Sequence, residues 1–411
     1  MNYLLLGAGK TVIECLKALI KLKKRVSICI NKEELTKIKE YYVMLDEVII
    51  FDDFYKIDFT KYEYIVRSPG LSILNPYIKY LKDHEIKMIN EMELAYILTN
   101  KKGYYIGVTG SNGKTTTVSL LYECIKKQTN NVILAGNIGI PLISFLDKIN
   151  NYTIIILEMS SFQLEDMHEL KLDIGCILNM SINHLDNVCD LEYYYNSKIN
   201  ISNLQTINDY LVTNINDIEI NKRLKNVNSK IIDYSVTNLK TSDFKLKGEH
   251  NKDNIKAVIT ILNILGFEVD CFVLKNFLPL NYRLNEYKHK NITIVNDSKS
   301  TSVDSLIKAI ETYNDKSIIL IFGGKNKGGN FKLLNDYKLK KKICFGSLSK
   351  EIKDVEVDYS DFKLDDCVSY ALNIADEEDV VLFSCGCSSF DLFDNYKERG
   401  EYFDKLIKKN K

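Results

Sequence analysis

Residues 104–117 read YYIGVTGSNGKTTT, an apolar run with glycines at 107, 110 and 113 that leads into Lys114 and a run of threonines. Glycine lets backbone N–H groups turn toward a phosphate without a Cβ in the way, and a following helix N-terminus adds positive potential. We therefore predict a strand, a phosphate-binding loop and a helix, with Lys114 on the β/γ-phosphates and the Thr115 hydroxyl on Mg²⁺. Val108 stands where the standard G-x-x-x-x-G-K-[ST] pattern has its first glycine, so a glycine-rich turn without function is the alternative.

The residues on either side of this loop alternate between short apolar runs and longer amphipathic stretches, which is typical of βαβ units and parallel sheets. We predict an α/β protein of three domains, each on a mostly parallel sheet: residues 1–91, 92–280 and 281–411. The expected strands are Leu4–Leu6, Ser27–Ile30, Glu47–Phe51, Tyr64–Val66, Tyr104–Val108, Val132–Leu134, Ile154–Leu157, Ile174–Leu178, Tyr210–Thr213, Ile292–Val295, Ile318–Phe322 and Val380–Phe383. The expected helices are 11–24, 73–83, one from about 114, and His250–Leu265.

A single carboxylate follows the strand at Ile154–Leu157. A nucleotide-binding sheet usually presents a carboxylate to the metal at this point, and Glu158 stands there. Taken alone, a Glu after an apolar run is only a strand end. Together with Lys114 and Thr115, it is a candidate Mg²⁺ ligand.

Composition limits the class of partner. Lys+Arg and Asp+Glu are both 55, so the net charge is +0, which argues against nucleic acid or an anionic membrane as the main partner. The ten cysteines are scattered without a C-x-x-C pair, which favours free thiols in a reducing compartment. The first apolar run breaks at Gly7, and no run reaches the ~18 residues of a membrane helix. We expect a cytoplasmic, monomeric enzyme that acts on small molecules.

Several further segments resemble the Mur ligase family, and the resemblance runs from one end of the chain to the other. They are Gly110-Ser-Asn-Gly-Lys-Thr-Thr116, Glu158-Met-Ser-Ser-Phe-Gln-Leu-Glu165, Asn179-Met-Ser-Ile-Asn-His-Leu-Asp186, Gly248-Glu-His-Asn251, Arg283, Asn296-Asp-Ser-Lys-Ser-Thr301 and Gly323-Gly-Lys-Asn-Lys-Gly328. The resemblance implies an ATP-dependent amide-bond ligase. The segment at 158–165 is similar to that of the branch that adds D-glutamate to UDP-N-acetylmuramoyl-L-alanine. Asn183, Tyr282, Asn285 and Asn326 depart from the family pattern and leave the detailed adenine and closure contacts open.

The resemblance also implies roles for residues that chemistry alone would not select. It implies two Mg²⁺ sites, with His184 and a carbamylated Lys198 joining Glu158 and Thr115 as ligands. Without the family pattern, a solvated helix-surface lysine would be the plainer interpretation of Lys198, and Mg²⁺ prefers oxygen ligands to a histidine. The implied ATP contacts are Gly110, Ser111, Asn112, Gly113, Lys114, Thr115, Thr116, Thr117, Asn251, Asn254, Arg283, Asp297 and Lys299, with His250 facing the adenine. Lys114, Glu158, His184, Lys198 and Arg283 form the implied catalytic set.

Near the N-terminus, Leu4–Thr11 reads LLLGAGKT, a strand followed by a glycine turn. It lacks the third glycine of a dinucleotide-binding fingerprint, and the second strand ends at Asn31 rather than at an acidic residue. An oxidoreductase is therefore the weaker alternative. The family resemblance implies that this turn and Arg67-Ser-Pro-Gly70 hold the UDP part of the substrate. The implied contacts are Lys10, Thr11, Asn31, Gly70, Asn137, Ser160 and His184.

The amino-acid pocket is expected in the C-terminal domain. An incoming glutamate carries two carboxylates, so its pocket needs cationic and hydroxyl donors. The candidates from the resemblance are Thr301, Lys327, Ser389, Phe390 and Tyr396. A cation at Lys327 disfavours a diamino-acid substrate, although Ser388-Ser389 as a simple helix cap stays an alternative. A sister ligase with another amino acid, and a module that hydrolyses ATP without ligating, also remain open.

Overall fold

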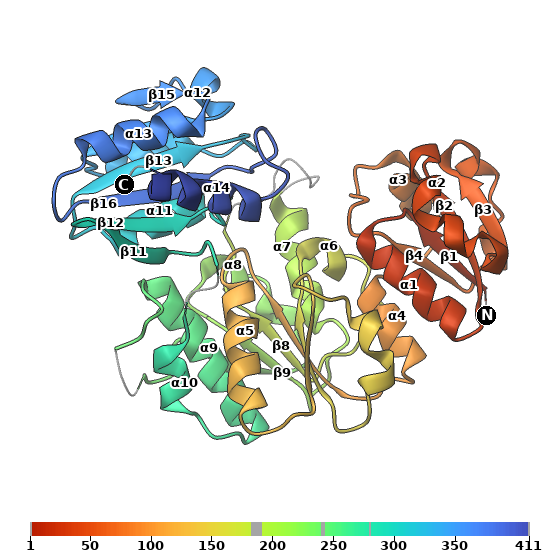
Figure 1. Ribbon diagram of the computed structural model, residues 1–411. Coiled ribbons are helices and arrows are strands. Elements are labelled where there is room, and N and C mark those ends of the chain that lie inside the picture. The colour runs from red at the N-terminus through yellow and green to blue at the C-terminus, as the bar shows by residue number, and fades with distance from the viewer. Residues whose placement is uncertain (1, 182–190, 240–242, 279–280, 410–411) are drawn as a thin grey trace. The chain divides into compact units, whose positions relative to one another are not determined.

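The computed structural model describes residues 2–181, 191–239, 243–278 and 281–409. They form three sheets flanked by helices, drawn in Figure 1. Contacts divide the chain into two compact units, and the first two sheets belong to one of them. Unit 1 comprises the described residues of 1–180, 187–238 and 255–270, and unit 2 contains the third sheet. The domain bounds 1–91, 92–280 and 281–411 stay a prediction.

The first sheet has four parallel strands in the order β3-β2-β1-β4. The strands are β1 (Asn2–Leu6), β2 (Arg25–Ile30), β3 (Glu47–Ile50) and β4 (Tyr64–Arg67), with helices α1 (Lys10–Lys21) and α3 (Pro76–Asp83). Helix α3 begins where the Asn75 side chain accepts hydrogen bonds from the N–H groups of Tyr77 and Ile78, with Pro76 at the first helical position. This combination of an Asn cap and an N1 proline is a strong start signal for a helix.

The second sheet contains the phosphate loop. Its strands are β5 (Tyr104–Thr109), β6 (Val132–Gly136), β7 (Ile154–Glu158), β8 (Ile174–Ile177), β9 (Tyr210–Thr213) and β10 (Lys230–Asp233). All run parallel, in the order β10-β9-β8-β5-β7-β6. Helix α5 (Lys114–Lys126) follows β5 directly. Because β5 lies between β7 and β8, the carboxyl ends of these three strands meet at one edge of the sheet.

Helix α4 (Glu91–Leu98) connects the first two sheets and contributes to their shared apolar core, which also contains Tyr3 and Tyr105. Two glutamates of α4 are buried. Glu91 accepts a hydrogen bond from the N–H of Ile143, and Glu93 accepts from the N–H groups of residues 168–170. Burial raises the pKa of both carboxyls to about 7. These glutamates satisfy backbone donors that would otherwise be buried without a partner.

The third sheet lies in unit 2 and has the order β11-β12-β16-β13-β14-β15. Its strands are β11 (Asn285–His289), β12 (Ile292–Asp297), β13 (Ile318–Gly323), β14 (Lys341–Phe345), β15 (Tyr359–Asp361) and β16 (Val380–Gly386). Only β11 is antiparallel to its neighbour. Helices α11 (Val303–Thr312), α13 (Leu364–Ile374) and α14 (Tyr396–Lys409) pack in two apolar layers, and β12, β13 and β16 are buried throughout. Both faces of these strands are covered, as parallel sheets require.

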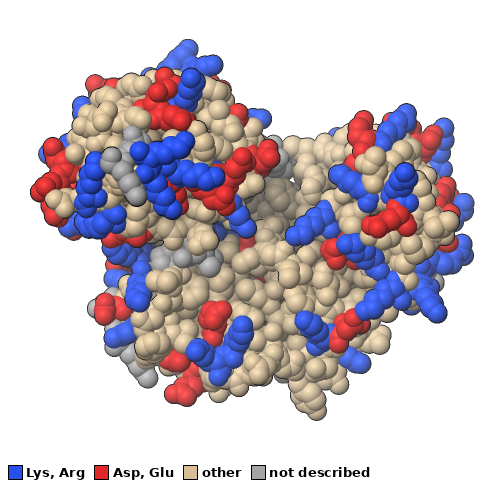
Figure 2. Space-filling model, viewed as in Figure 1, with Lys and Arg blue, Asp and Glu red and all other residues tan. Residues whose placement is uncertain are grey.

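The expected α/β class with three mostly parallel sheets is confirmed, and every strand expected from the sequence is present with ends shifted by at most three residues. Four strands were not predicted: β10, β11, β14 and β15. The bounds of helix α9 (Glu249–Leu265) match the expected helix within one residue, and α10 (Cys271–Asn276) follows it. Across the described ranges, no helix combines the length and apolar character needed to cross a membrane. Acidic and basic side chains both occur over the face drawn in Figure 2.

Candidate active site at the carboxyl edge of the second sheet

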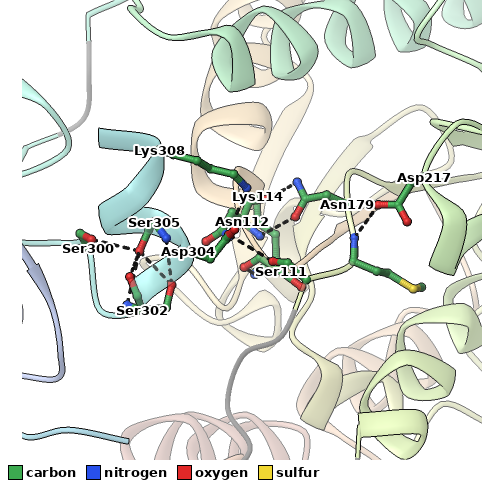
Figure 3. A network of polar contacts seen from close by, with 12 residues as sticks. Ser111, Asn112, Lys114, Asn179, Asp217, Ser300, Ser302, Asp304, Ser305 and Lys308 are labelled. Carbon is green, nitrogen blue, oxygen red and sulfur yellow. Dashed lines mark hydrogen bonds and ion pairs between the residues drawn. The ribbon is translucent and has the colours of Figure 1, made fainter. Parts of the chain in front are cut away.

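The loop between β5 and α5 is fixed by an asparagine that follows β8. Asn179 accepts a hydrogen bond from the N–H of Asn112 (2.9 Å), and its side-chain amide donates to the Asn112 carbonyl (3.1 Å). Its own carbonyl accepts from the N–H of Ser111 (3.0 Å). Gly110 and Gly113 have φ angles of 152° and 86°, which favour glycine. The loop is therefore held in one shape by a residue 67 positions away, as Figure 3 shows.

Two lysines share one carbonyl of this loop. The ammonium of Lys114 donates to the carbonyl oxygens of Gly110 (2.5 Å) and Ser111 (3.0 Å). Lys198, on helix α7 (Leu191–Ile199), donates to the same Gly110 oxygen (3.1 Å) and lies 4.3 Å from the centre of the Tyr194 ring. Lys198 is only 1% exposed. Burial, together with the charge of Lys114, holds the pKa of Lys198 well below its usual range.

Glu158 ends β7 beside the loop and is almost fully buried. Its Oε1 accepts from the side-chain amide of Asn137 (3.1 Å), and its Oε2 has no hydrogen-bond partner among the described residues. At Gly136 a Cβ would come within 2.4 Å of the Glu158 carbonyl oxygen, so only glycine allows this approach. A buried carboxylate oxygen without a donor fits a bound cation, because such an oxygen otherwise loses its solvation.

The structure describes only some of the other expected metal ligands. His184 and Asn183 lie outside the described residues. Within those described, no three His, Cys, Asp or Glu side chains form a metal-binding group. Lys198 would offer the oxygen ligands that Mg²⁺ prefers only as a carbamate. Of the expected ligands, the structure describes Glu158 at the end of β7, Thr115 in the first turn of α5 and Lys198 on α7, and their binding of Mg²⁺ stays a prediction.

The expected UDP contacts that the structure describes lie in unit 1. Lys10 and Thr11 begin α1, and Asn31 forms a capping box with Glu34. Ser160 forms a second capping box, with Gln163 of the short helix α6 (Ser161–Leu164). A Cβ at Gly7 or Gly9 would lie 3.2 Å from the Ser68 side chain, so the glycine turn packs against the segment 67–70.

Arg67, which precedes Ser68, has partners that the sequence did not suggest. Its side chain is 2% exposed, and its guanidinium donates to the Phe162 carbonyl (3.0 Å) and to Glu165 (3.1 Å). It also lies 2.9 Å from an Asp166 oxygen. Within the segment 67–70, the backbone and Gly70 remain the candidate substrate contacts, while the Arg67 side chain connects β4 to α6.

The expected adenine contacts lie at the start of α9. The side-chain amide of Asn251 donates to the Lys247 carbonyl (2.7 Å), and that of Asn254 donates to Asn251 (3.0 Å). Burial lowers the pKa of His250 to about 4, so this imidazole is neutral at physiological pH. These three residues belong to unit 2, as do Arg283, Asp297 and Lys299.

Asp297 ends β12 and accepts hydrogen bonds from the Ser384 hydroxyl (2.8 Å) and the N–H of Leu284 (3.2 Å). Burial raises its pKa to about 7.

The Lys299 ammonium lies 4.1 Å from the centre of the Tyr396 ring. Thr301 stands in a turn fixed by hydroxyl groups, in which Ser300 and Ser302 each contact Ser305 (Figure 3).

The structure brings together two of the expected pocket segments, the Gly323–Gly328 loop and Ser388–Phe390. Lys325 and Ser388 exchange backbone hydrogen bonds of 3.0 and 3.1 Å, and the Ser388 hydroxyl donates to the Lys325 carbonyl. The Lys327 ammonium lies 5.9 Å from the centre of the Phe390 ring. The next helix, α14, begins only at Tyr396, so the alternative that Ser388-Ser389 caps a helix directly after the strand is wrong.

The chain is similar to curated ligases over nearly its whole length. Residues 108–273 match the Mur ligase middle domain. UDP-N-acetylmuramoylalanine–D-glutamate ligase of Clostridioides difficile is 32% identical, over 97% of this chain and 96% of that protein. The ligase of the same name from Thermosipho melanesiensis is 34% identical, over 99% of this chain and 97% of its own. That from Aquifex aeolicus is 36% identical over 84% and 87%. The chain belongs to the Mur ligase family.

Solved structures of Mur ligases have the same fold. MurF ligase of Thermotoga maritima, in complex with ADP, aligns with a TM-score of 0.61 over 85% of this chain and 90% of its own, at 18% identity. UDP-N-acetylmuramate-alanine ligase MurC of the same organism aligns with a TM-score of 0.55 over the full length of both chains, also at 18% identity. At such identities the likeness supports the three-sheet Mur ligase fold and leaves the substrate open.

Proposed function

We propose that this Mur ligase joins D-glutamate to UDP-N-acetylmuramoyl-L-alanine in peptidoglycan precursor synthesis, with ATP as the energy source, as a cytoplasmic monomer. The observation that carries the proposal is the name shared by relatives that are 32–36% identical over most of the chain. The cation of Lys327 in the Gly323–Gly328 loop adds support, because a substrate with two carboxylates needs cationic partners.

The reaction has to overcome the poor electrophilicity of a carboxylate. Transfer of the γ-phosphoryl group of ATP to the substrate carboxylate gives an acyl phosphate and ADP. The amine of D-glutamate then attacks the acyl carbon, and inorganic phosphate leaves from the tetrahedral intermediate. The protein contributes positioning and charge neutralisation. Lys114, held over the carbonyls of the phosphate loop, is the cation that we assign to the β/γ-phosphates.

Magnesium is the metal that we propose for the site. When bound, Mg²⁺ would neutralise phosphate charge beside Lys114. Glu158 would hold it through the Oε2 that no described donor satisfies, with Thr115, His184 and a carbamate on Lys198 as further ligands. Asn137 fixes the other oxygen of Glu158 and so orients the carboxylate. The nucleotide would further contact Asn251, Asn254, Arg283, Asp297 and Lys299.

One assay tests the proposal against its alternatives. Purified enzyme with UDP-N-acetylmuramoyl-L-alanine, ATP and Mg²⁺ is offered D-glutamate, L-glutamate, L-alanine or a diamino acid, and ADP release and the ligated product are measured. We expect both only with D-glutamate. A preference for another amino acid would identify a sister ligase. ADP release that is independent of every amino acid would indicate an ATP-hydrolysing module instead.

A further inference from the structure

Arg399 on α14 is the largest side chain of the described residues that is fully buried, with an exposure of 0%. None of the ion pairs between described residues includes it. Its Nε donates to the Ser298 hydroxyl (3.0 Å), Nη2 donates to the Ser298 carbonyl (2.7 Å), and Nη1 donates to the Cys387 carbonyl (3.1 Å). A buried guanidinium needs well-placed acceptors, and these three bonds give each of its three nitrogens one.

Of the two residues that accept these bonds, Ser298 lies within the segment that ends at Thr301, and Cys387 directly precedes the segment Ser388–Phe390. Ser298 lies between Asp297 and Lys299, three residues before Thr301, and its hydroxyl also donates to the Tyr396 carbonyl (2.8 Å). Cys387 follows β16 and stands two residues before Ser389. One guanidinium therefore connects the loop after β12, the loop after β16 and the first turn of α14.

The third pocket segment is attached to the same group. The Gly323–Gly328 loop, which contains Lys327, is connected to Ser388 by the Lys325–Ser388 hydrogen bonds. At Gly324 a Cβ would come within 3.1 Å of Nη1 of Arg399 and 2.4 Å of the Ser388 carbonyl oxygen. The loop thus passes directly over the arginine, and position 324 has no room for a side chain.

We infer that Arg399 is a positioning residue for the amino-acid substrate: it holds the segments of Thr301, Lys327 and Ser389 in the arrangement that binds the two carboxylates of the incoming amino acid. The inference rests on the proposed function. The guanidinium is rigid and planar, and its fixed donor directions can hold three backbone segments in position at once. A lysine ammonium cannot reproduce that geometry. Small displacements of such groups cost large factors in rate, although Arg399 itself does not touch the substrate.

The test uses the full-length variants Arg399→Lys and Ser298→Ala, with KM measured separately for the amino acid, ATP and the UDP substrate. We expect KM for the amino acid to rise by about tenfold or more in Arg399→Lys, and less in Ser298→Ala, while the other two constants stay within about twofold. Arg67→Lys is the matched control, because it also alters a buried arginine. It should lower the melting temperature without a selective change in KM for the amino acid.

Two results would overturn the inference: unchanged KM for the amino acid in both folded variants, or a parallel rise for ATP. Ser298→Ala keeps the test decisive if Arg399→Lys does not fold, because it removes one hydroxyl and leaves every backbone acceptor. The proposed function fails separately, if wild-type enzyme does not use D-glutamate. The same comparison then applies to whichever amino acid supports ADP release.

Discussion

Lys114 and Lys198 place two side-chain nitrogens on the same carbonyl oxygen, that of Gly110. We predict that Lys114→Ala lowers the rate of ADP release by a factor of about 100 or more, because the main cation facing the phosphates is lost. ADP release and a thermal melt measure activity and fold together. Lys126→Ala, an exposed change in the last turn of the same helix, is the control and should be neutral. Near-normal turnover in folded Lys114→Ala would remove the phosphate-loop assignment.

Lys198 is predicted to be carbamylated in the active enzyme. Its lowered pKa makes the amine neutral at a pH where an exposed lysine is charged, and the neutral amine is the form that reacts with CO₂. With ¹³C-labelled bicarbonate, wild-type enzyme should show a carbamate carbon signal that is absent from Lys198→Arg. Removal of bicarbonate should lower activity reversibly in the wild type only. An unmodified amine in fully active enzyme would contradict the prediction.

Lys327 is predicted to bind a carboxylate of the amino acid. Lys327→Ala should raise KM for D-glutamate by about tenfold or more, with KM for ATP within about twofold, because one charge-assisted hydrogen bond is lost on one substrate only. Steady-state kinetics with each substrate varied in turn give both values. Lys325→Ala is the control, since that side chain is exposed and its backbone supplies the bridge to Ser388. Equal effects of both substitutions would count against a specific role.

At the scale of elements, one buried cluster joins the first sheet to the second. In it, Arg67 on β4 contacts Glu165 and Asp166, which follow α6. We predict that Arg67→Met lowers stability by about 3 kcal/mol, because two buried carboxylates lose their nearest cation. The double variant Arg67→Met/Glu165→Gln should recover part of that loss, since Lys82 remains beside Asp166. Melting curves of the single and double variants test this coupling.

The control for this contact is Arg25→Met, which breaks the exposed Arg25–Asp46 pair at the start of β2 and should cost less than about 1 kcal/mol. Strictly additive losses in Arg67→Met and Glu165→Gln would show that the two side chains do not act together. A rise in KM for the UDP substrate is expected in Arg67→Met, because Ser68 and Gly70 follow directly on the chain.

The sequence predicted the strands that have a continuous apolar run, and it missed four strands that lack one. β10 (KIID) and β15 (YSD) are short edge strands without a buried residue, and the inner strand β14 begins with two lysines. The antiparallel β11 alternates in exposure and is dominated by polar side chains. A short strand without a continuous apolar run resembles a loop in sequence, whatever its place in the sheet.

For the candidate site, Gly110–Thr117 and Glu158 could be proposed from the sequence, because the glycines, Lys114 and the carboxylate occur together in a phosphate-loop pattern. The residues that hold the loops of the site in place could not be predicted. Asn179 is one of many asparagines, and its role depends on β8 lying beside β5. Arg399 occurs in the charged run Lys397-Glu-Arg-Gly-Glu401, which indicates a solvated helix face. Lys198 was named through the family resemblance, but its burial was not predicted, because it depends on tertiary packing.

In the whole molecule, the sheets differ in the length of chain that must be synthesised before all their strands are present. The first sheet uses only residues 2–67, so all its strands are present early in synthesis. In the third sheet, β16 lies between β12 and β13, which do not pair with each other. This sheet can close only when residues 380–386 have left the ribosome. A chain that stops earlier would expose the open edges of β12 and β13, and such edges are sites of aggregation.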